Sequence, residues 1–393
     1  MLEGKNIAAF SKEWRSDWTS NHHVLTALAE RNRVLWINSI GMRAPVLASN
    51  RDRRRIFGKI RAWLNGPVPV RTPSAVSPSG KYPKAGLYVF TPLVWPFAGP
   101  AWLKKLSRCL LKKQILGAVR RLEMEPFQLW TFLPTAEPYV GALGERLSVY
   151  YCTDNWRLFP YLNGPEIAAC EAKLLRKVDL VFAASHFLRD EKKAANPNTY
   201  LITHGVNRIF SEPAAVAPKE IARLKQPRLG FYGWLRETID QELLCRLAQS
   251  FPEATIVLLG KTSGDFTRLS SLANIRFLGQ RPYAELPEYA ACFDVGLIPY
   301  RMQPELMAAT NPVKLKEYLA LGIPVVSTDL AEVRPYRQAC WIAGNTDEFI
   351  RAVKEALGPE GKIRAALGRE MVKKETWTEK VEEISRILIR NGA

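Results

Sequence analysis

Two ionisable side chains in one short segment have a spacing that suits anion binding. The segment is NPVKLKEYLALGIPVVSTDL, residues 311–330, in which Asn311 can cap a helix and Gly322 can end it before an apolar strand. Lys314 and Glu317 stand three residues apart, so they share one face beside the positive end of that helix. This arrangement predicts a cradle for a nucleotide diphosphate, with Glu317 accepting both ribose hydroxyls. A surface Lys–Glu pair on an ordinary helix is the alternative.

Turns after two other strands supply further candidates for the same site. In FYGWLRETID, Gly233 permits close backbone approach and Arg236 can reach a phosphate. The strand VGLIPY ends at Tyr300, and a loop of about ten residues, 301–310, leads to the helix. Because carboxyl ends of parallel strands share one edge of a sheet, these residues are expected to converge. The predicted donor-binding set is Gly233, Arg236, Tyr300, Thr310, Asn311, Lys314 and Glu317.

Polar residues also follow strands in the amino-terminal half. Asp154, in CTDNW, stands where a carboxylate can act as a general base or cap the next turn. Asn21 and His23 open the first helix, where they can bind an acceptor or phosphate or cap the helix. The sequence has no D-x-D pair and no His or Cys cluster with metal-ligand spacing, so no metal or other cofactor is expected.

Strand-like and helix-like segments alternate in both halves of the chain. The first half has candidate strands at 6–10, 33–38, 87–90, 128–132, 147–152, 178–185 and 199–203, and candidate helices at 21–31, 102–122, 135–145 and 165–177. The second half has candidate strands at 227–233, 255–260, 275–279, 295–300, 323–328 and 340–343. The alternation predicts an α/β fold with two Rossmann-like, doubly wound domains facing across a cleft.

The domain boundaries are expected in polar and Pro-rich segments. The prediction is an acceptor-binding domain over 1–210, a linker over 211–227 and a nucleotide-binding domain over 228–370. A last helix over 371–393 is expected to pack back on the first domain.

Positive charge is concentrated near the amino terminus. The chain has a formal charge of +18, and residues 1–120 contain 21 Lys and Arg against five acids. The segment 102–122 places Leu103, Leu106, Leu110, Ile115 and Val119 at roughly helical spacing among basic residues. This pattern predicts a surface that docks on anionic lipid; a solvated face on a core helix and a nucleic-acid surface are the alternatives. The predicted membrane-facing residues are Arg53, Arg54, Arg55, Lys104, Lys105, Lys112 and Lys113.

The location of the chain is predicted from its cysteines and its hydropathy. Its six cysteines are scattered without a C-x-x-C pair, which predicts reduced thiols. The sequence shows neither a signal-peptide pattern at its start nor a run of eighteen apolar residues. A cytoplasmic protein, peripheral on the inner face of the membrane, is expected.

The segments above carry a resemblance to known enzymes. NPVKLKEYLALGIPVVST, together with FYGWLRETID and IRFLGQRPYAELPEYAACFDVGLIPY, resembles the donor domain of GT-B glycosyltransferases that use nucleotide-diphospho sugars. In the first half, SKEWRSDWTSNHHV, VYYCTDNWRLFP, VDLVFAAS and THGVN are similar to bacterial exopolysaccharide glycosyltransferases. These include the membrane-associated, inverting xanthan glucuronosyltransferase and teichuronic-acid-type enzymes.

The resemblance implies a chemistry and roles for three residues. The general base of the xanthan-type enzyme falls on Asp154 and its helix lysine on Lys314, while Glu317 stands where that enzyme has an amide. Retaining GT-B enzymes commonly have a first glutamate where this chain has Ala309, which favours an inverting mechanism. The implied reaction moves a sugar from a nucleotide-diphospho donor, a UDP-sugar being favoured, to a lipid-linked or polysaccharide acceptor.

Three alternatives to this reaction stay open. Within the fold they are a retaining transferase and a nucleotide-sugar epimerase. In another class, the basic half is compatible with a nucleic-acid-binding protein.

Overall fold

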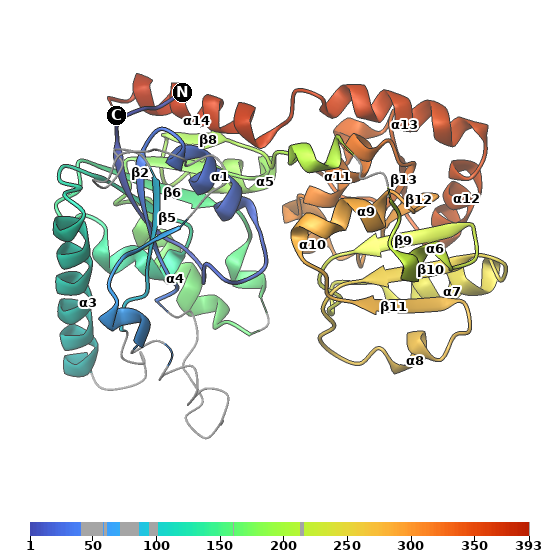
Figure 1. The fold of residues 1–393 in the computed structure, drawn as a ribbon, viewed down its shortest axis with the longest axis horizontal. Helices are drawn as coiled ribbons and strands as arrows, with labels where there is room; N and C mark the ends of the chain where they lie inside the picture. Colours follow the sequence, from blue (N-terminus) through green and yellow to red (C-terminus); the bar gives the residue numbers. More distant parts are fainter. Residues whose placement is uncertain are drawn as a thin grey trace. The chain divides into compact units, whose positions relative to one another are not determined.

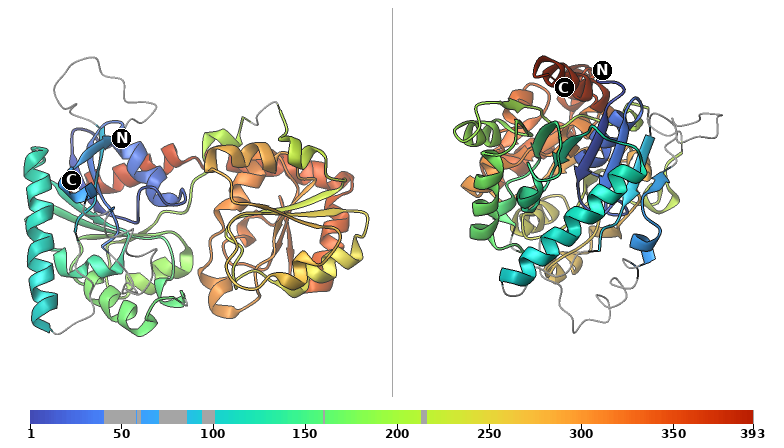
Figure 2. Two further views of the ribbon diagram at one scale, coloured as in Figure 1. Left: turned by 60° about the horizontal axis from the view of Figure 1, so that its bottom comes forward. Right: turned by 90° about the vertical axis from the view of Figure 1, so that its left-hand side faces the viewer.

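The chain folds as two compact α/β units. The computed structural model describes residues 1–40, 58, 61–70, 86–93, 101–159, 161–212 and 216–392, apart from the side chains of Ala101 and Lys104 (Figure 1). Unit 1 comprises Met1–Thr203 and Lys380–Ala393, and unit 2 comprises His204–Glu379. Each unit contains one sheet with helices packed on it (Figure 2).

Unit 1 has an eight-stranded sheet in the order β3-β4-β2-β1-β5-β6-β7-β8. Its strands are β1 (Asn6–Phe10), β2 (Arg33–Ile37), β3 (Val68–Val70), β4 (Gly86–Phe90), β5 (Gln128–Thr131), β6 (Leu147–Cys152), β7 (Leu180–Ala183) and β8 (Thr199–Leu201). Its helices are α1 (Ser20–Ala29), α3 (Ala101–Arg121), α4 (Gly164–Leu175), α5 (His186–Lys193) and the 3-10 turns η1 (Pro134–Tyr139) and η2 (Trp156–Leu158). All neighbouring strands are parallel except β3 and β4.

Unit 2 has a six-stranded parallel sheet in the order β11-β10-β9-β12-β13-β14. Its strands are β9 (Arg228–Tyr232), β10 (Thr255–Leu259), β11 (Ile275–Gly279), β12 (Val295–Ile298), β13 (Val325–Thr328) and β14 (Trp341–Ala343). Its helices are η3 (Arg208–Phe210), α6 (Lys219–Ala222), α7 (Gln241–Ser250), α8 (Thr267–Ser270), η4 (Tyr283–Glu285), α9 (Leu286–Ala290), α10 (Pro304–Ala309), α11 (Val313–Leu321), η5 (Arg334–Tyr336), α12 (Thr346–Ala356) and α13 (Pro359–Val372). Helix α14 (Trp377–Arg390) begins in unit 2 and continues into unit 1.

Strand β10 of unit 2 is apolar on both faces because helices cover both. In β10, Ile256 and Leu258 belong to one core cluster, and Val257 and Leu259 belong to the other. Successive side chains of a strand point to opposite faces, so a fully buried strand reads as a continuous apolar run. The strand order reverses beside β9, which has β10 on one side and β12 on the other. Ligands of such sheets bind outside the carboxyl ends of the strands at this reversal.

The boundary between the units differs from the expected linker. The division falls between Thr203 and His204, ahead of the segment 211–227. Phe210, directly before the expected linker, and Ile221, within it, are fully buried in a core cluster of unit 2, so the chain already belongs to that unit there. The polar and Pro-rich composition concealed these two anchoring side chains.

Two helix predictions also need correction. The helix expected at 135–145 is the 3-10 turn η1, which contains Pro138. The single apolar face expected on 102–122 is divided: Ile115 and Val119 are buried, while Leu106 and Leu110 are 50% and 49% exposed. Trp102, one turn before Leu106, is 67% exposed, so α3 has an apolar stripe away from the core.

The predicted membrane-facing residues are only partly described. Arg53, Arg54 and Arg55 and the side chain of Lys104 lie outside the described residues. Lys105 and Lys113 are exposed on α3, and Lys112 is half-buried. Within the described ranges, no helix combines the length and the apolar character needed to cross a bilayer.

Candidate functional site

The glycine turn and the lysine of α11 lie against each other in unit 2. Gly233 follows β9 with φ of +137°, a conformation that side-chain-bearing residues rarely adopt. A Cβ atom at this position would lie 3.3 Å from Cε of Lys314 and 3.5 Å from its Nζ. The absence of a side chain at Gly233 therefore has two consequences. The backbone can adopt the positive φ of the turn, and the side chain of Lys314 has room beside it. This is the convergence that the sequence predicted.

Lys314 is held by hydroxyl and aromatic groups. Its Nζ donates a hydrogen bond of 2.6 Å to the hydroxyl of Tyr300. The same ammonium lies 5.2 Å from the ring centre of Phe231 and 5.0 Å from that of Tyr300, distances that permit cation–π attraction. Among the described residues it has no ion-pair partner. Its positive charge is therefore fixed in place and available to an anion.

Helix α11 presents its first turn beside this ammonium. The residue that caps it is Pro312, which makes no side-chain hydrogen bond to the turn; Asn311, predicted as the cap, precedes it. Gly322 ends the helix in the left-handed conformation, as predicted. Thr310 ends α10, a short helix within the segment that was expected to be a loop. The positive end of the α11 dipole adds to the attraction for an anion.

Glu317 lies one turn after Lys314 with its carboxylate held by two tyrosines. Its side chain is buried, and its two carboxylate oxygens accept hydrogen bonds from Tyr232 at 2.6 Å and Tyr283 at 2.7 Å. Burial raises the pKa of this carboxyl, while the two tyrosine hydroxyls and Lys314 oppose the rise. These hydrogen bonds join α11 to β9 and η4, and the contact of Glu317 with a ribose stays a prediction.

Two further cations, Arg236 and Lys261, follow the neighbouring strands β9 and β10 at the same sheet edge. The Arg236 guanidinium and the Lys261 ammonium lie 5.1 Å and 5.4 Å from the ring centre of Trp234. The two turns that carry them are joined by the backbone N–H of Leu235, which donates to the carbonyl of Lys261 at 2.9 Å. The sequence analysis did not predict Lys261. The available signal was the glycine turn after a strand, because Lys261 follows Gly260 after β10 as Arg236 follows Gly233 after β9.

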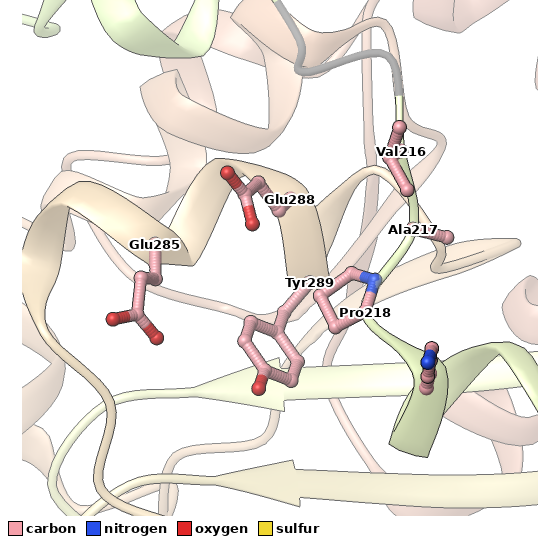
Figure 3. Close-up of a pocket in the computed structure, with 7 residues that line it drawn as sticks. Val216, Ala217, Pro218, Glu285, Glu288 and Tyr289 are labelled. Carbon is pink, nitrogen blue, oxygen red and sulfur yellow. The ribbon is translucent and has the colours of Figure 1, made fainter.

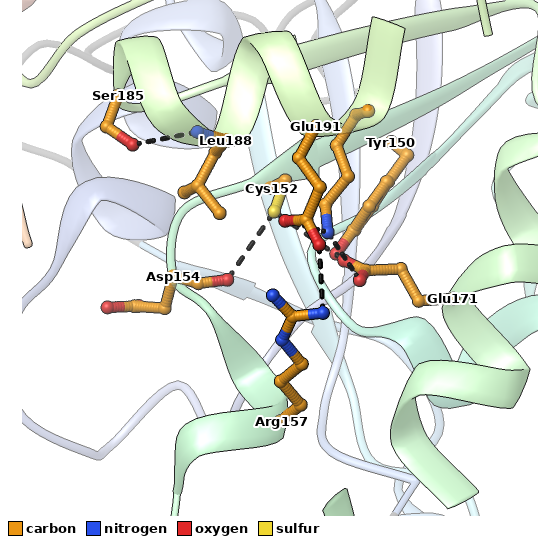
Figure 4. A network of polar contacts seen from close by, with 9 residues as sticks. Tyr150, Cys152, Asp154, Arg157, Glu171, Ser185, Leu188 and Glu191 are labelled. Carbon is orange, nitrogen blue, oxygen red and sulfur yellow. Dashed lines mark hydrogen bonds and ion pairs between the residues drawn. The ribbon is translucent and has the colours of Figure 1, made fainter. Parts of the chain in front are cut away.

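Asp154 is exposed at the carboxyl end of β6 in unit 1. Asn155, rather than Asp154, occupies the cap position of η2, so the aspartate is not the cap that the alternative assumed. Its carboxylate accepts a hydrogen bond from the hydroxyl of Thr153 at 3.3 Å. Its backbone carbonyl accepts one from the thiol of Cys152 at 3.4 Å (Figure 4). These bonds leave the carboxylate at the surface, as a general base requires.

A buried polar network holds the chain on both sides of Asp154. Before it, the hydroxyl of Tyr150 donates to Glu171 at 2.6 Å, and Glu171 accepts from Lys192 at 2.7 Å (Figure 4). Lys192 also donates to Glu191 at 3.0 Å, and Glu191 pairs with Arg157 at 2.9 Å. The network thereby joins β6 and η2 to α4 and α5.

Lys12 is a candidate that the sequence analysis missed. It follows β1 at the same sheet edge as Asp154 and is half-buried. Burial lowers the pKa of its ammonium to about 8, and the nearby carboxylates of Asp17 and Asp154 oppose this fall. Its position just after the first strand was the available signal.

Asn21 and His23 take part in contacts between the β1 end and α1. Both are buried: Nδ2 of Asn21 donates to the Ser11 hydroxyl at 2.9 Å, and Nδ1 of His23 accepts from the indole N–H of Trp18 at 3.2 Å. His22 is fully buried, which lowers its pKa to about 4. These side chains hold the turn between β1 and α1, and their acceptor or phosphate role stays a prediction.

A depression elsewhere in unit 2 does not contain the predicted donor residues. It has a volume of about 580 Å³ and is lined by Val216, Ala217, Pro218, Lys219, Glu285, Glu288 and Tyr289 (Figure 3). Two carboxylates on its wall disfavour a nucleotide diphosphate. Across the described ranges, no three His, Cys, Asp or Glu side chains form a metal-binding group.

The lowered pKa of Lys12 leads to a labelling prediction. At pH 8, about half of a group with a pKa of 8 is neutral, whereas a lysine with a pKa near 10.5 is almost wholly protonated. Acetylation by a small reagent, followed by mass spectrometry, should therefore modify Lys12 with a pH midpoint near 8, and a free N-acetyl-lysine amide labelled in parallel with a higher one. Asp154→Asn removes an opposing carboxylate and should move the Lys12 midpoint lower. Equal midpoints for Lys12 and the free lysine amide would contradict the assignment.

Comparisons with known proteins agree with this architecture. Residues 221–358 match the family model of glycosyl transferases group 1. TuaH of Bacillus subtilis, described as a teichuronic acid biosynthesis glycosyltransferase, is 28% identical over 235 residues. That match covers 54% of this chain and 59% of TuaH, so it extends over little more than half of either protein.

Solved structures share the fold over nearly the whole chain. Anabaena HepE in complex with UDP has 16% identity and a TM-score of 0.66, covering 98% of this chain and 100% of that one. Sucrose-phosphate synthase from Thermosynechococcus elongatus has 13% identity and a TM-score of 0.71, covering 98% and 99%. The protein therefore has the GT-B fold, and its residues 221–358 are similar to the glycosyl transferases group 1 family.

Proposed function

We propose that the chain is an inverting glycosyltransferase that moves a sugar from a UDP-sugar to a lipid-linked or polysaccharide acceptor of a cell-surface glycan. The observation that carries the proposal is the contact of the Gly233 turn with Lys314 at the strand-order reversal of unit 2. The similarity of residues 221–358 to group 1 glycosyl transferases supports the reaction class. The UDP and UDP-glucose complexes of HepE support the donor, and the description of TuaH supports the pathway class.

In this proposal unit 2 binds the donor through its diphosphate. Lys314 and the first turn of α11 neutralise one phosphate, and Arg236 and Lys261 attract the other. Negative charge grows on the diphosphate as the sugar leaves, so the same groups bind the transition state more tightly than the ground state. The cations supply this stabilisation without a metal ion. Tyr300 fixes the ammonium in advance through its 2.6 Å hydrogen bond.

Unit 1 binds the acceptor and supplies the general base. The carboxylate of Asp154 removes the proton from the attacking hydroxyl, whose oxygen forms the new bond to the anomeric carbon. The bond from that carbon to the diphosphate oxygen breaks, and its electron pair leaves with UDP. A single displacement inverts the anomeric centre. Ala309, apolar and 9% exposed, offers no carboxylate to the donor sugar, which supports this outcome over retention.

The exposed stripe of α3 supports peripheral binding to an anionic membrane. Trp102, Leu106 and Leu110 stand one turn apart and are about half exposed or more. Lys105 and Lys113 are exposed on the same helix. Apolar side chains that enter the lipid interface beside lysines that meet anionic headgroups are typical of interfacial helices. An acceptor attached to lipid would then be presented at the surface to which unit 1 binds.

Replacing Lys314 tests the donor site. Lys314→Ala removes a charge-assisted hydrogen bond, which contributes about 1.5–3 kcal/mol, so UDP affinity should fall roughly tenfold to a hundredfold. Uridine affinity should change little, because uridine has no phosphate. Calorimetric titration measures both, with exposed Lys354→Ala on α12 as the control. Unchanged UDP binding by Lys314→Ala would remove it from the site.

Asp154→Asn tests the base. The amide preserves the shape but accepts no proton, so turnover should fall at least about a hundredfold while UDP affinity stays near wild type. Asp190→Asn changes an exposed aspartate of α5; it is the matched control and should retain activity. The anomeric configuration of the wild-type product, assigned by NMR, should be inverted. A folded Asp154→Asn variant with near-normal turnover, or a retained configuration, contradicts the mechanism.

The membrane proposal predicts a charge-dependent association. Each basic residue near an anionic surface contributes about 1 kcal/mol, so replacing Lys105, Lys112 and Lys113 with Gln should sharply reduce pelleting with phosphatidylserine vesicles. The control replaces Lys354, Lys362 and Lys374 of unit 2, which changes the net charge equally. Retention on DNA is measured alongside at the same salt. Tight DNA binding without vesicle binding would make the basic half a nucleic-acid surface instead.

A further inference from the structure

Two side-chain N–H groups directly after Asp154 have no hydrogen-bond partner in the part of the chain that the structure describes. They are Nδ2 of Asn155 and Nε1 of Trp156. Asn155 is only 7% exposed, and it stands at the cap position of η2 without making a capping bond. Nearly all buried polar groups in native proteins are paired, because an unpaired one has lost its water without compensation. Two such donors in consecutive residues therefore point to a ligand.

Neighbouring contacts hold these donors in place. The indole ring of Trp156 stacks on Phe159, with ring centres 5.4 Å apart and planes inclined by 29°. The next residue, Arg157, pairs with Glu191 at 2.9 Å (Figure 4). The turn is thus anchored by groups other than its two N–H donors. Satisfied buried indoles occur elsewhere in the unit: Nε1 of Trp130 donates to Gln128 at 3.1 Å.

Exposed apolar side chains follow the two donors along the chain. Leu158 and Tyr161 are 42% and 45% exposed, and the ring of Tyr161 lies 5.5 Å from that of Phe159 in an edge-to-face arrangement. Binding sites for small polar molecules combine such apolar surface with a few fixed polar groups. For a sugar ring, the aromatic faces meet the C–H groups and the N–H donors meet the hydroxyl oxygens.

We propose that Asn155, Trp156 and the aromatic surface of Phe159 and Tyr161 form the subsite for the acceptor sugar. This inference rests on the proposed function, in which Asp154 must lie within hydrogen-bond reach of an acceptor hydroxyl. The two residues that follow Asp154 donate to oxygens beside that hydroxyl on the same sugar. When the sugar binds, both N–H groups form hydrogen bonds to its oxygens, and the attacking hydroxyl is oriented toward Asp154.

The indole N–H of Trp156 provides a direct test. Protein labelled with ¹⁵N-tryptophan is titrated with the methyl glycosides of glucose, galactose, mannose, N-acetylglucosamine and glucuronic acid. The Trp156 signal is the one lost in Trp156→Phe, a change that keeps an aromatic ring for Phe159. At least one glycoside should move this signal in a saturable way, and glycerol at equal hydroxyl concentration should not.

A pair of asparagine variants separates binding from structure. Asn155→Ala should weaken the same glycoside about tenfold, which is the effect of one lost hydrogen bond, without lowering the melting temperature. Asn163→Ala, in the same loop, removes the cap that accepts from the N–H of Glu166. It should lower the melting temperature and leave glycoside affinity unchanged. Equal glycoside affinity in Asn155→Ala and wild type overturns the role of Asn155.

The donor site is monitored in the same spectra, because Trp234 lies beside Arg236 and Lys261. If UDP moves the Trp234 signal but no glycoside moves that of Trp156, the acceptor subsite is wrong and the proposed function stands. If a glycoside moves the Trp156 signal but UDP has no effect on any tryptophan, the sugar site is supported and the donor assignment fails.

Discussion

The proposed donor site depends on the contacts that hold the ammonium group of Lys314 in place. Lys314 is held by the Tyr300 hydroxyl and by two aromatic faces, and within the described ranges it forms no ion pair. Such a cation attracts an anion more strongly than a salt-bridged one, because its charge is not already compensated. The absence of a side chain at Gly233 makes room for it. The adjoining turn is constrained in the same way, since a Cβ at Gly260 would lie 1.9 Å from the carbonyl oxygen of Gly233.

Glu317 helps to position Lys314 by fixing the helix that carries it. It lies one turn after Lys314 and joins α11 to the end of β9 through Tyr232 and to η4 through Tyr283. A buried carboxylate with two hydroxyl donors fixes the orientation of the helix that carries the lysine. Unit 1 uses a comparable device, in which Glu171 and Lys192 hold the residues around Asp154. In both units a buried polar network positions an accessible charged group at a carboxyl sheet edge.

Local patterns in the sequence were sufficient for the fold and for part of the site. The alternation of apolar strands and helices predicted two parallel sheets, and the shared strand edge brought Gly233 together with Lys314. The partners of Glu317 were not predictable, because Tyr232 lies 85 residues earlier and its hydroxyl direction depends on packing. The burial of His23 was not predictable for a similar reason. Its burial depends on Trp18 and on the turn after β1, which the helix pattern alone does not specify.

The central claim is that unit 2 recognises the diphosphate of a nucleotide rather than its nucleoside. Calorimetric titration of the wild-type protein with uridine, UMP and UDP tests this most directly, because the three ligands differ only in their phosphates. The account predicts affinities that rise in this order, with UDP at least about a hundredfold tighter than uridine, since two charge-assisted contacts are gained. Equal affinities for the three ligands, or no binding of UDP, would contradict it.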